Sequence, residues 1–503
     1  MFRFLVLLCF LTLLSYCKNE PKALVHVVED TIGDTSVIVS KFCGSCHLLP
    51  APTLLDKRTW AEFVLPNMGC RLGLETENYN PIGGLNMMEQ TLIHDREIYP
   101  DSSKITRNDW LKVLGYYSTY APDSLPVISD KNKSLAQFEI VPLGSLIKYP
   151  IVTMLSVDSL KHEVKIGLES GVIYTLDQSF HLIDTINIKS TPLGISTDEN
   201  RNQYILSVGR MYPSEQSFGS IFQLGSHHSL TKIIEGLHRP VFLSFDQMAG
   251  FNNLIISEFG YETGGLTRFQ YNNKSWQKAE NLDSQPGSVK TLIADLDNDH
   301  VNEIIALMAQ GQERVVLYKP DSSGHLTSKT LLRFPPVYGL CDMDIADMNG
   351  DGKPDIILSN GDNADYSKII KPYHGIRIYL NKGDLIFEES NFIPYPGVLH
   401  SEIADFDGDG DMDIAATSFF PGDESHPYKS FKYFQNNDGK YEPYSFSNAN
   451  YGKWMTIASG DFDGDGDRDI LLGSFLLNQY LVEGIAADWS KYALVLLKNK
   501  LRK

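Results

Sequence analysis

The sequence predicts a multidomain protein in which a small all-α domain precedes an all-β seven-bladed propeller. At 503 residues the chain is longer than one compact core usually serves, so two or more domains are expected. Around Trp110 apolar residues recur at helical spacing, whereas beyond about residue 123 short apolar runs alternate with Gly, Asn and Asp. In that second part an aspartate-rich motif recurs at intervals of 52, 58 and 56 residues, which is the period of a propeller blade.

The N-terminus combines a basic residue, Arg3, with an apolar run over residues 4–14 that is too short to span a bilayer. With the cysteine that follows, this segment resembles a bacterial lipoprotein signal. The resemblance implies that residues 1–16 are a signal peptide, that Cys17 becomes the lipidated first residue, and that residues 17–35 form a linker. An ordinary cleaved signal is the alternative. We therefore expect an extracytoplasmic protein, lipid-anchored to a bacterial cell envelope and facing the periplasm or the cell surface.

Cys43, Cys46 and His47 form the pattern C-x-x-C-H, which is the attachment signature of c-type haem. On one helical turn the two thiols can each form a thioether with a haem vinyl group, and the adjacent histidine then faces the iron. A thioredoxin-like redox pair would require a preceding strand in a βαβ pattern, and a zinc site would require a second ligand pair. The sequence therefore predicts one covalent haem c with His47 as an axial ligand.

The second axial ligand must come from downstream, and Met68 is the first methionine after the haem motif, with Met87 and Met88 as alternatives. The haem motif, the segment ending at Met68 and a final helix around Trp110 together resemble small bacterial class I cytochrome c domains. The resemblance covers residues 36–122 and implies that Met68 binds the iron. A thioether sulfur opposite a histidine raises the reduction potential, which suits electron transfer.

Four copies of the aspartate-rich motif carry oxygen ligands at alternate positions and a final carboxylate. Such spacing can surround one Ca²⁺, and a glycine permits the tight turn. The candidate ligands are Asp295, Asp297, Asp299 and Glu303; Asp347, Asn349, Asp351 and Asp355; Asp405, Asp407, Asp409 and Asp413; and Asp461, Asp463, Asp465 and Asp469. An EF-hand would need a glutamate at its twelfth position, where these copies have Ala306, Leu358, Ala416 and Leu472. Each copy instead runs directly into an apolar strand.

This strand-flanked pattern resembles the FG-GAP or VCBS repeat family, whose propeller blades carry a calcium loop between their first strands, as in integrin α chains. The resemblance implies three to four calcium sites. The first copy is the weakest candidate, because His300 replaces a glycine and Glu303 replaces the final aspartate. Three earlier units, which begin near residues 157, 196 and 244, keep the blade pattern without the aspartates, and with the four copies they give seven blades.

The last blade lacks a fourth strand at its C-terminal end, whereas residues 137–141 resemble the outer strand of another blade. We therefore expect residues 135–142 to close the ring by completing the last blade, which leaves no open sheet edge. The propeller then spans residues 135–500, and residues 123–134 form the linker after the helical domain.

The net charge of −19 argues against a nucleic-acid partner, because phosphate binding needs clustered Lys and Arg. The sequence has no G-x-S-x-G, Walker or H-E-x-x-H motif, so it indicates an electron carrier rather than an enzyme. A redox partner protein would dock on the propeller.

The alternative is a calcium-dependent binding protein with a glycan or protein ligand, in which the haem is subsidiary; oxidation of a substrate by the propeller itself also stays open. His374, His400 and His426 are expected to be surface histidines between strands, and the pairing of Cys70 and Cys341 is not predictable.

Overall fold

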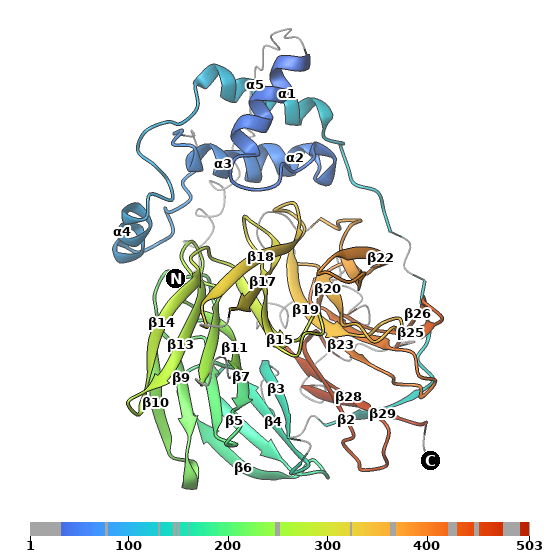
Figure 1. Cartoon of the computed structure of the whole chain (residues 1–503). Helices are drawn as coiled ribbons and strands as arrows, with labels where there is room; N and C mark the ends of the chain where they lie inside the picture. Colours follow the sequence, from blue (N-terminus) through green and yellow to red (C-terminus); the bar gives the residue numbers. More distant parts are fainter. Residues whose placement is uncertain are drawn as a thin grey trace, which may run out of the picture.

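The protein is described by a computed structural model that covers residues 32–75, 79–128, 131–143, 147, 151–158, 160–246, 252–321, 324–362, 369–420, 430–446, 452–475 and 493–501. The predicted signal peptide, the predicted lipidation site Cys17, and His426 lie outside these residues. Within the described ranges, no helix is long and apolar enough to cross a membrane. A helical body comes first along the chain and lies over one face of a ring of sheets (Figure 1).

The helical body contains seven short helical segments among the described residues. They are α1 (Ile32–Cys43), η1 (Pro52–Leu54), α2 (Lys57–Thr59), η2 (Trp60–Val64), α3 (Leu65–Arg71), α4 (Met87–Asp95) and α5 (Arg107–Tyr120). The hydroxyl of Thr106 accepts the N–H of Asp109 and so caps the start of α5. The rings of Trp60 and Tyr117 lie 4.3 Å apart in the core, beside fully buried Val113. Helix α5 thus packs its apolar face against the segments that precede it.

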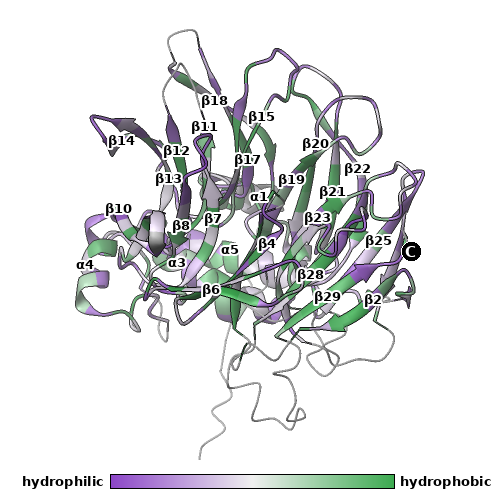
Figure 2. Cartoon of the chain, turned by 90° about the horizontal axis from the view of Figure 1, so that it is seen from below, coloured by the Kyte–Doolittle hydropathy of each residue, from purple (hydrophilic) through white to green (hydrophobic). Residues whose placement is uncertain are grey.

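Seven sheets form the propeller, and each sheet is one blade, which confirms the predicted seven-bladed architecture. In Figure 2 the blades are seen from below, arranged around a centre. The first strand of each blade contacts the first strands of both adjacent blades, so these strands surround the centre.

The strands of the first three blades are β3 (Val152–Asp158), β4 (Glu163–Leu168), β5 (Val172–Leu176), β6 (Leu182–Asn187); β7 (Pro192–Thr197), β8 (Gln203–Ser207), β9 (Gly219–Leu224), β10 (Leu230–Leu237); β11 (Pro240–Asp246), β12 (Asn253–Glu258), β13 (Gly265–Asn272) and β14 (Ser275–Asp283). Those of the next two are β15 (Ser288–Ala294), β16 (Glu303–Met308), β17 (Arg314–Pro320), β18 (Leu326–Arg333); β19 (Leu340–Ala346), β20 (Asp355–Asn360), β21 (Gly375–Asn381) and β22 (Phe387–Pro394). The last two comprise β23 (Val398–Ala404), β24 (Asp413–Ser418), β25 (Phe431–Asn437), β26 (Lys440–Ser445); β27 (Trp454–Gly460), β28 (Asp469–Ser474) and β29 (Leu494–Asn499), together with β1 (Lys133–Ser134) and β2 (Phe138–Pro142).

The chain segment before the first blade pairs with the last two blades. Strand β2 runs antiparallel to β29 with Phe138 opposite Asn499, and it supplies the fourth strand of the seventh sheet. Strand β1 pairs in parallel with β26 and extends the sixth sheet to five strands. The ring of Phe138 packs edge-on against Tyr433 of the sixth blade at 5.4 Å. The N- and C-terminal ends of the propeller sequence are therefore joined in one sheet, which leaves β29 covered on both sides.

Apolar side chains of the central strands fill the space between neighbouring blades. Strand β20 is buried along its whole length. Its residues Ile356 and Leu358 pack with the fourth blade, whereas Ile357 packs with the sixth. Because successive side chains of a strand point to opposite faces, one strand with a continuous apolar run serves two inter-blade cores.

The helical body contacts loops of the propeller through an ion pair, a hydrogen bond and apolar packing. Arg71 of α3 forms an ion pair with Glu262 at 2.7 Å, and the Tyr99 hydroxyl donates to the same carboxylate at 2.7 Å. Val337 and Ile369 of the propeller pack against the helical core. These contacts hold the helical body against the propeller rather than leaving it suspended on its linker.

Candidate functional site

The C-x-x-C-H motif lies where α1 ends. Cys43 is the last residue of α1 and is partly buried against the helical core, while Cys46 and His47 lie in the turn that follows. Burial raises the pKa of the Cys43 thiol to about 11. A reactive thioredoxin-type cysteine needs a lowered pKa, so the surroundings of Cys43 do not favour that alternative.

The imidazole of His47 is oriented by the backbone of the next residue, Leu48. Its Nδ1 lies 2.9 Å from the Leu48 carbonyl oxygen, so Nδ1 carries the proton and donates it, and Nε2 keeps its lone pair. Burial, together with the nearby charge of Arg71, lowers the pKa of His47. The ring is therefore neutral at pH 7 and fixed in the tautomer that a metal-binding histidine requires.

The structure brings Met68, rather than Met87 or Met88, to the core that contains Cys43. Met68 on α3 is partly buried and packs in the same cluster as Cys43. Met87 and Met88 begin α4 and have exposed fractions of 84% and 69%. A thioether that binds iron must lie close to the haem motif, so the position of Met68 fits that role better than the alternatives do.

The residues around the motif also fit a large apolar group. Leu48 and Leu49, directly after His47, leave 42% and 37% of their surfaces exposed, beside a well-packed core. Two thiols, a neutral imidazole and a thioether form a donor set suited to covalent haem and its iron. We therefore judge that the residues present fit a c-type haem.

The four aspartate loops share one backbone arrangement. In each loop the first aspartate accepts N–H groups from residues further along the loop, as when Asp347 accepts from Asp351 at 3.1 Å and from Gly352 at 2.7 Å. Two glycines in each of the later three loops have positive φ, for example 80° at Gly352. In the first loop His300 takes this conformation with φ of 69°, which a non-glycine residue adopts only at a cost in strain.

In the later three loops the final carboxylate fastens the loop to the backbone of the third strand of its blade. Asp413 accepts the N–H of Phe406 at 3.0 Å and that of Asn436 at 2.7 Å, and it is fully buried. Asp355 and Asp469 make the equivalent pairs of bonds. Burial raises the pKa of Asp413 and that of Asp469 to about 6. These side chains therefore have a structural role in the loop in addition to any role as ligands.

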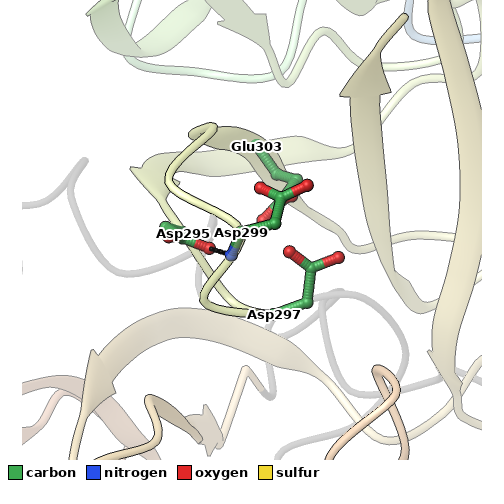
Figure 3. Close-up of side chains that lie close together, drawn as sticks. All are labelled: Asp295, Asp297, Asp299 and Glu303. Atoms are coloured by element: carbon green, nitrogen blue, oxygen red, sulfur yellow. Dashed lines mark hydrogen bonds between the residues drawn. The ribbon is translucent and has the colours of Figure 1, made fainter.

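Three of the loops gather carboxylates closely enough for one small cation. Ligand atoms within 4.8 Å of one another are offered by Asp295, Asp297, Asp299 and Glu303; by Asp405, Asp407 and Asp413; and by Asp461, Asp463 and Asp465. Figure 3 shows the first of these groups. In the part of the chain that the structure describes, Asp347, Asp351 and Asp355 form no such group, and Asp409 and Asp469 lie outside the groups of their own loops.

A charged cluster on the first strands of three blades was not predicted from the sequence. Lys290 on β15 lies 2.8 Å from Asp342 and 3.1 Å from Asp344, both on β19. His400 on β23 lies 3.3 Å from Asp342. Although burial opposes it, the charges of Lys290 and His400 hold the pKa of Asp342 well below its usual range. Burial, with the charge of Asp344 next, raises the pKa of Glu402 on β23 to about 7.

Two of the predicted surface histidines are located differently from expectation. His400 lies within β23, not in a connecting loop, because its strand begins at Val398. His374 precedes β21 as expected, but its exposed fraction is only 1%, and burial lowers its pKa well below the usual value. Both thiols of Cys70 and Cys341 are buried, and they are not joined to each other.

Comparisons with known proteins bear on the propeller. A search of curated proteins gives no match. Among solved structures, the chain is similar to a streptogramin B lyase at 12% identity and a TM-score of 0.45, over 73% of this chain and 100% of that one. It is also similar to the Neurospora crassa Pan2 WD40 domain at 9% identity and a TM-score of 0.45, over 74% and 98% of the two chains. Residues 295–358, which span the first two aspartate loops, match the family of FG-GAP-like repeats.

Proposed function

We propose that this protein is an extracytoplasmic, membrane-anchored monohaem c-type cytochrome that transfers electrons, and that its propeller binds calcium and docks a partner. The observation that carries the proposal is the C-x-x-C-H motif at the end of α1, beside Met68. Cys43 and Cys46 would hold the haem covalently, and His47 and Met68 would bind its iron. When bound, the haem supplies a one-electron carrier with a fixed reduction potential.

Residues of the chain would orient the iron ligand His47, keep it unprotonated and exclude water from one side of the site. The Leu48 carbonyl orients the His47 ring, and the low pKa of that ring keeps it unprotonated. The core around Trp60 and Tyr117 excludes water from one side. Contacts from the propeller hold the helical body in place, so a redox partner docked on the propeller would reach the haem at the helical surface that the propeller leaves exposed.

The test is to produce the full chain in a host that matures c-type haem and to measure its absorption spectrum. We expect haem that stays attached in a denaturing gel and a reduced spectrum with the sharp α band of c-type haem. Met68→Ala should remove the weak sulfur-to-iron band of the oxidised form, whereas Met87→Ala and Met88→Ala, at exposed positions, should keep it. A chain without covalent haem would refute this function. Loss of the band in Met87→Ala or Met88→Ala alone would reassign the ligand.

Membrane attachment is a separate part of the proposal and rests on the sequence of residues 1–17. Acylation of Cys17 would anchor the protein to the cell envelope. We expect Cys17→Ser to move the protein from the membrane fraction to the soluble fraction of the same host, without a change in its absorption spectrum. An unchanged distribution would refute lipidation at this residue.

A second candidate function is calcium-dependent binding of a glycan or protein ligand by the propeller. It is supported by the match of residues 295–358 to FG-GAP-like repeats and by the three clusters of carboxylates in the aspartate loops. Calcium would bind these loops through carboxylate and backbone oxygens. If chelation of calcium abolished binding to an envelope or surface ligand while a chain without haem still bound it, this second function would be the better account.

A further inference from the structure

The first aspartate loop contains a positively charged side chain of the protein itself. The Lys319 ammonium, on the third strand of the same blade, lies 2.6 Å from Asp297, 2.7 Å from Asp299 and 2.9 Å from Glu303. These are three of the four carboxylates that gather in this loop. Each distance is that of a charge-assisted contact.

Strand pairing shows which residues take the place of Lys319 in the other blades. In the fourth blade Ile304 pairs with Tyr318, and the same pairing in the next three joins Ile356 to Tyr379, Ile414 to Phe434 and Ile470 to Leu497. The residues that follow are therefore equivalent. They are Lys319, Leu380, Gln435 and Lys498. Only two of the four positions thus carry a positive charge.

A sequence difference at the next position explains why Lys319 contacts more carboxylates than Lys498 does. In the later blades the next residue is an asparagine, whose backbone N–H is donated to the buried final aspartate, as from Asn499 to Asp469 at 2.7 Å. In the first loop this residue is Pro320, which has no N–H to donate. The final carboxylate there is Glu303, which is fully buried and whose second oxygen faces Lys319 instead.

Two departures from the repeat pattern therefore occur together with a lysine in one blade. Glutamate replaces aspartate at the final position, proline replaces asparagine, and lysine occupies the position before the proline. The longer Glu303 side chain and the Lys319 ammonium meet where the other loops use a backbone amide. Lys498, by contrast, forms an ion pair with Asp463. One oxygen of Glu303 accepts the N–H of Leu296, and Lys319 faces the other, so the ammonium offsets the cost of burying this carboxylate.

We propose that the Lys319 ammonium is the resident cation of the loop 295–303, so that this loop is closed without calcium and metal binding is confined to the later loops. The claim that metal binding is confined to the later loops rests on the proposed calcium function, and it is the second half of this inference. The first half concerns the chain alone: the Lys319 ammonium forms ion pairs with Asp297, Asp299 and Glu303. Calcium would have to displace an ammonium that is held by three carboxylates and attached to the same blade.

The test replaces Lys319 by the residues that other blades carry at this position, in the full chain. Lys319→Leu copies Leu380, and Lys319→Gln copies Gln435. Lys278→Leu, on the exposed outer strand β14, is the matched control. Bound calcium per chain is measured by titration calorimetry, and thermal unfolding is followed in EDTA and in calcium.

We expect Lys319→Leu to bind one more calcium ion per chain than the wild type. In EDTA its melting temperature should fall by a few degrees, because three carboxylates lose their cation, and calcium should restore it. Adding Asp297→Asn to Lys319→Leu should abolish the additional calcium. Lys278→Leu should match the wild type in both measurements.

The outcomes separate this inference from the calcium function. If neither wild type nor Lys319→Leu binds calcium, but the variant alone melts earlier in EDTA, Lys319 is the resident cation and the calcium function fails. If Asp299→Asn in the otherwise unchanged chain loses one calcium ion, the loop binds metal in spite of Lys319 and the inference fails. It also fails if the Lys319 variants equal the wild type in both calcium content and melting temperature in EDTA.

Discussion

The junction between the helical body and the propeller gives the sharpest prediction. Glu262 has a side chain that is only 10% exposed, and it receives both the Arg71 guanidinium and the Tyr99 hydroxyl at 2.7 Å. Hydrogen bonds to a charged group contribute about 1.5 to 3 kcal/mol each. Because Arg71 is 34% exposed, water screens its pair and the lower end applies. We expect Glu262→Gln, which keeps the size of the side chain, to destabilise the docked helical body by about 2 kcal/mol.

The assay is urea unfolding of the haem-loaded chain, with the Soret band reporting on the helical body and far-ultraviolet circular dichroism on the propeller. At about 1 to 3 kcal/mol per molar urea, the helical midpoint of Glu262→Gln should fall by roughly 1 M, while the propeller transition stays in place. Glu62→Gln is the control, because its pair with Arg58 is exposed and should contribute little. A double-mutant cycle with Arg71→Gln should give a coupling near 1 kcal/mol. An unchanged helical midpoint, or strictly additive effects, would refute the docking argument.

Two further predictions concern the propeller. Phe138→Ala should lower the free energy of unfolding, measured in urea, by about 3 to 5 kcal/mol, because the Phe138 side chain is buried against Tyr433 where the circle of blades closes. Glu139→Ala, at an exposed position of the same strand, should have almost no effect. Glu402 has its pKa raised to about 7 in the folded chain, so the fold binds its proton more tightly than the unfolded chain does. The contribution of Glu402 to the free energy of unfolding is therefore fully present at about pH 4. It is lost as the pH rises through 7, by up to about 3 kcal/mol. Glu402→Gln should flatten this dependence in unfolding measured from pH 4 to 8, and an unchanged slope would contradict it.

The seven blades were predictable because their signal is local. Each aspartate loop and the apolar strand after it lie within about ten residues of one another, and the motif recurs at a nearly constant interval. The charged cluster of Lys290, Asp342 and Glu402 was not predictable in this way. Its members are spread over three blades, and each one by itself looks like an ordinary polar residue in a strand.

Two further contacts could not be predicted from local sequence for the same reason: that of Lys319 with its loop, and that between Arg71 and Glu262. Lys319 reaches its loop only because β17 pairs with β16, so its role depends on strand register rather than on motif spacing. Arg71 and Glu262 are 191 residues apart in the sequence. Nothing local distinguishes either from other charged surface residues, and their contact exists only once the helical body is docked.

The topology of the blades separates the two proposed sites and leads to a last prediction. In an antiparallel blade the connection between the first two strands lies at one face of the ring, and that between the second and third lies at the other. The aspartate loops are first-to-second connections, whereas Glu262 lies between the second and third strands of its blade and Ile369 does so in another. The helical body therefore docks on the face opposite the aspartate loops (Figure 1).

If calcium binds the aspartate loops, it lies on the opposite face of the ring from the helical body that carries His47. We then expect it to influence a haem at His47 only by keeping the blades together. We expect EDTA to lower the melting temperature of the propeller while the absorption spectrum and reduction potential of the folded protein stay the same. A shift of the potential in EDTA, at a temperature where far-ultraviolet circular dichroism is unchanged, would mean that the two faces are coupled through the blades. In that case the propeller would regulate the haem rather than only hold it.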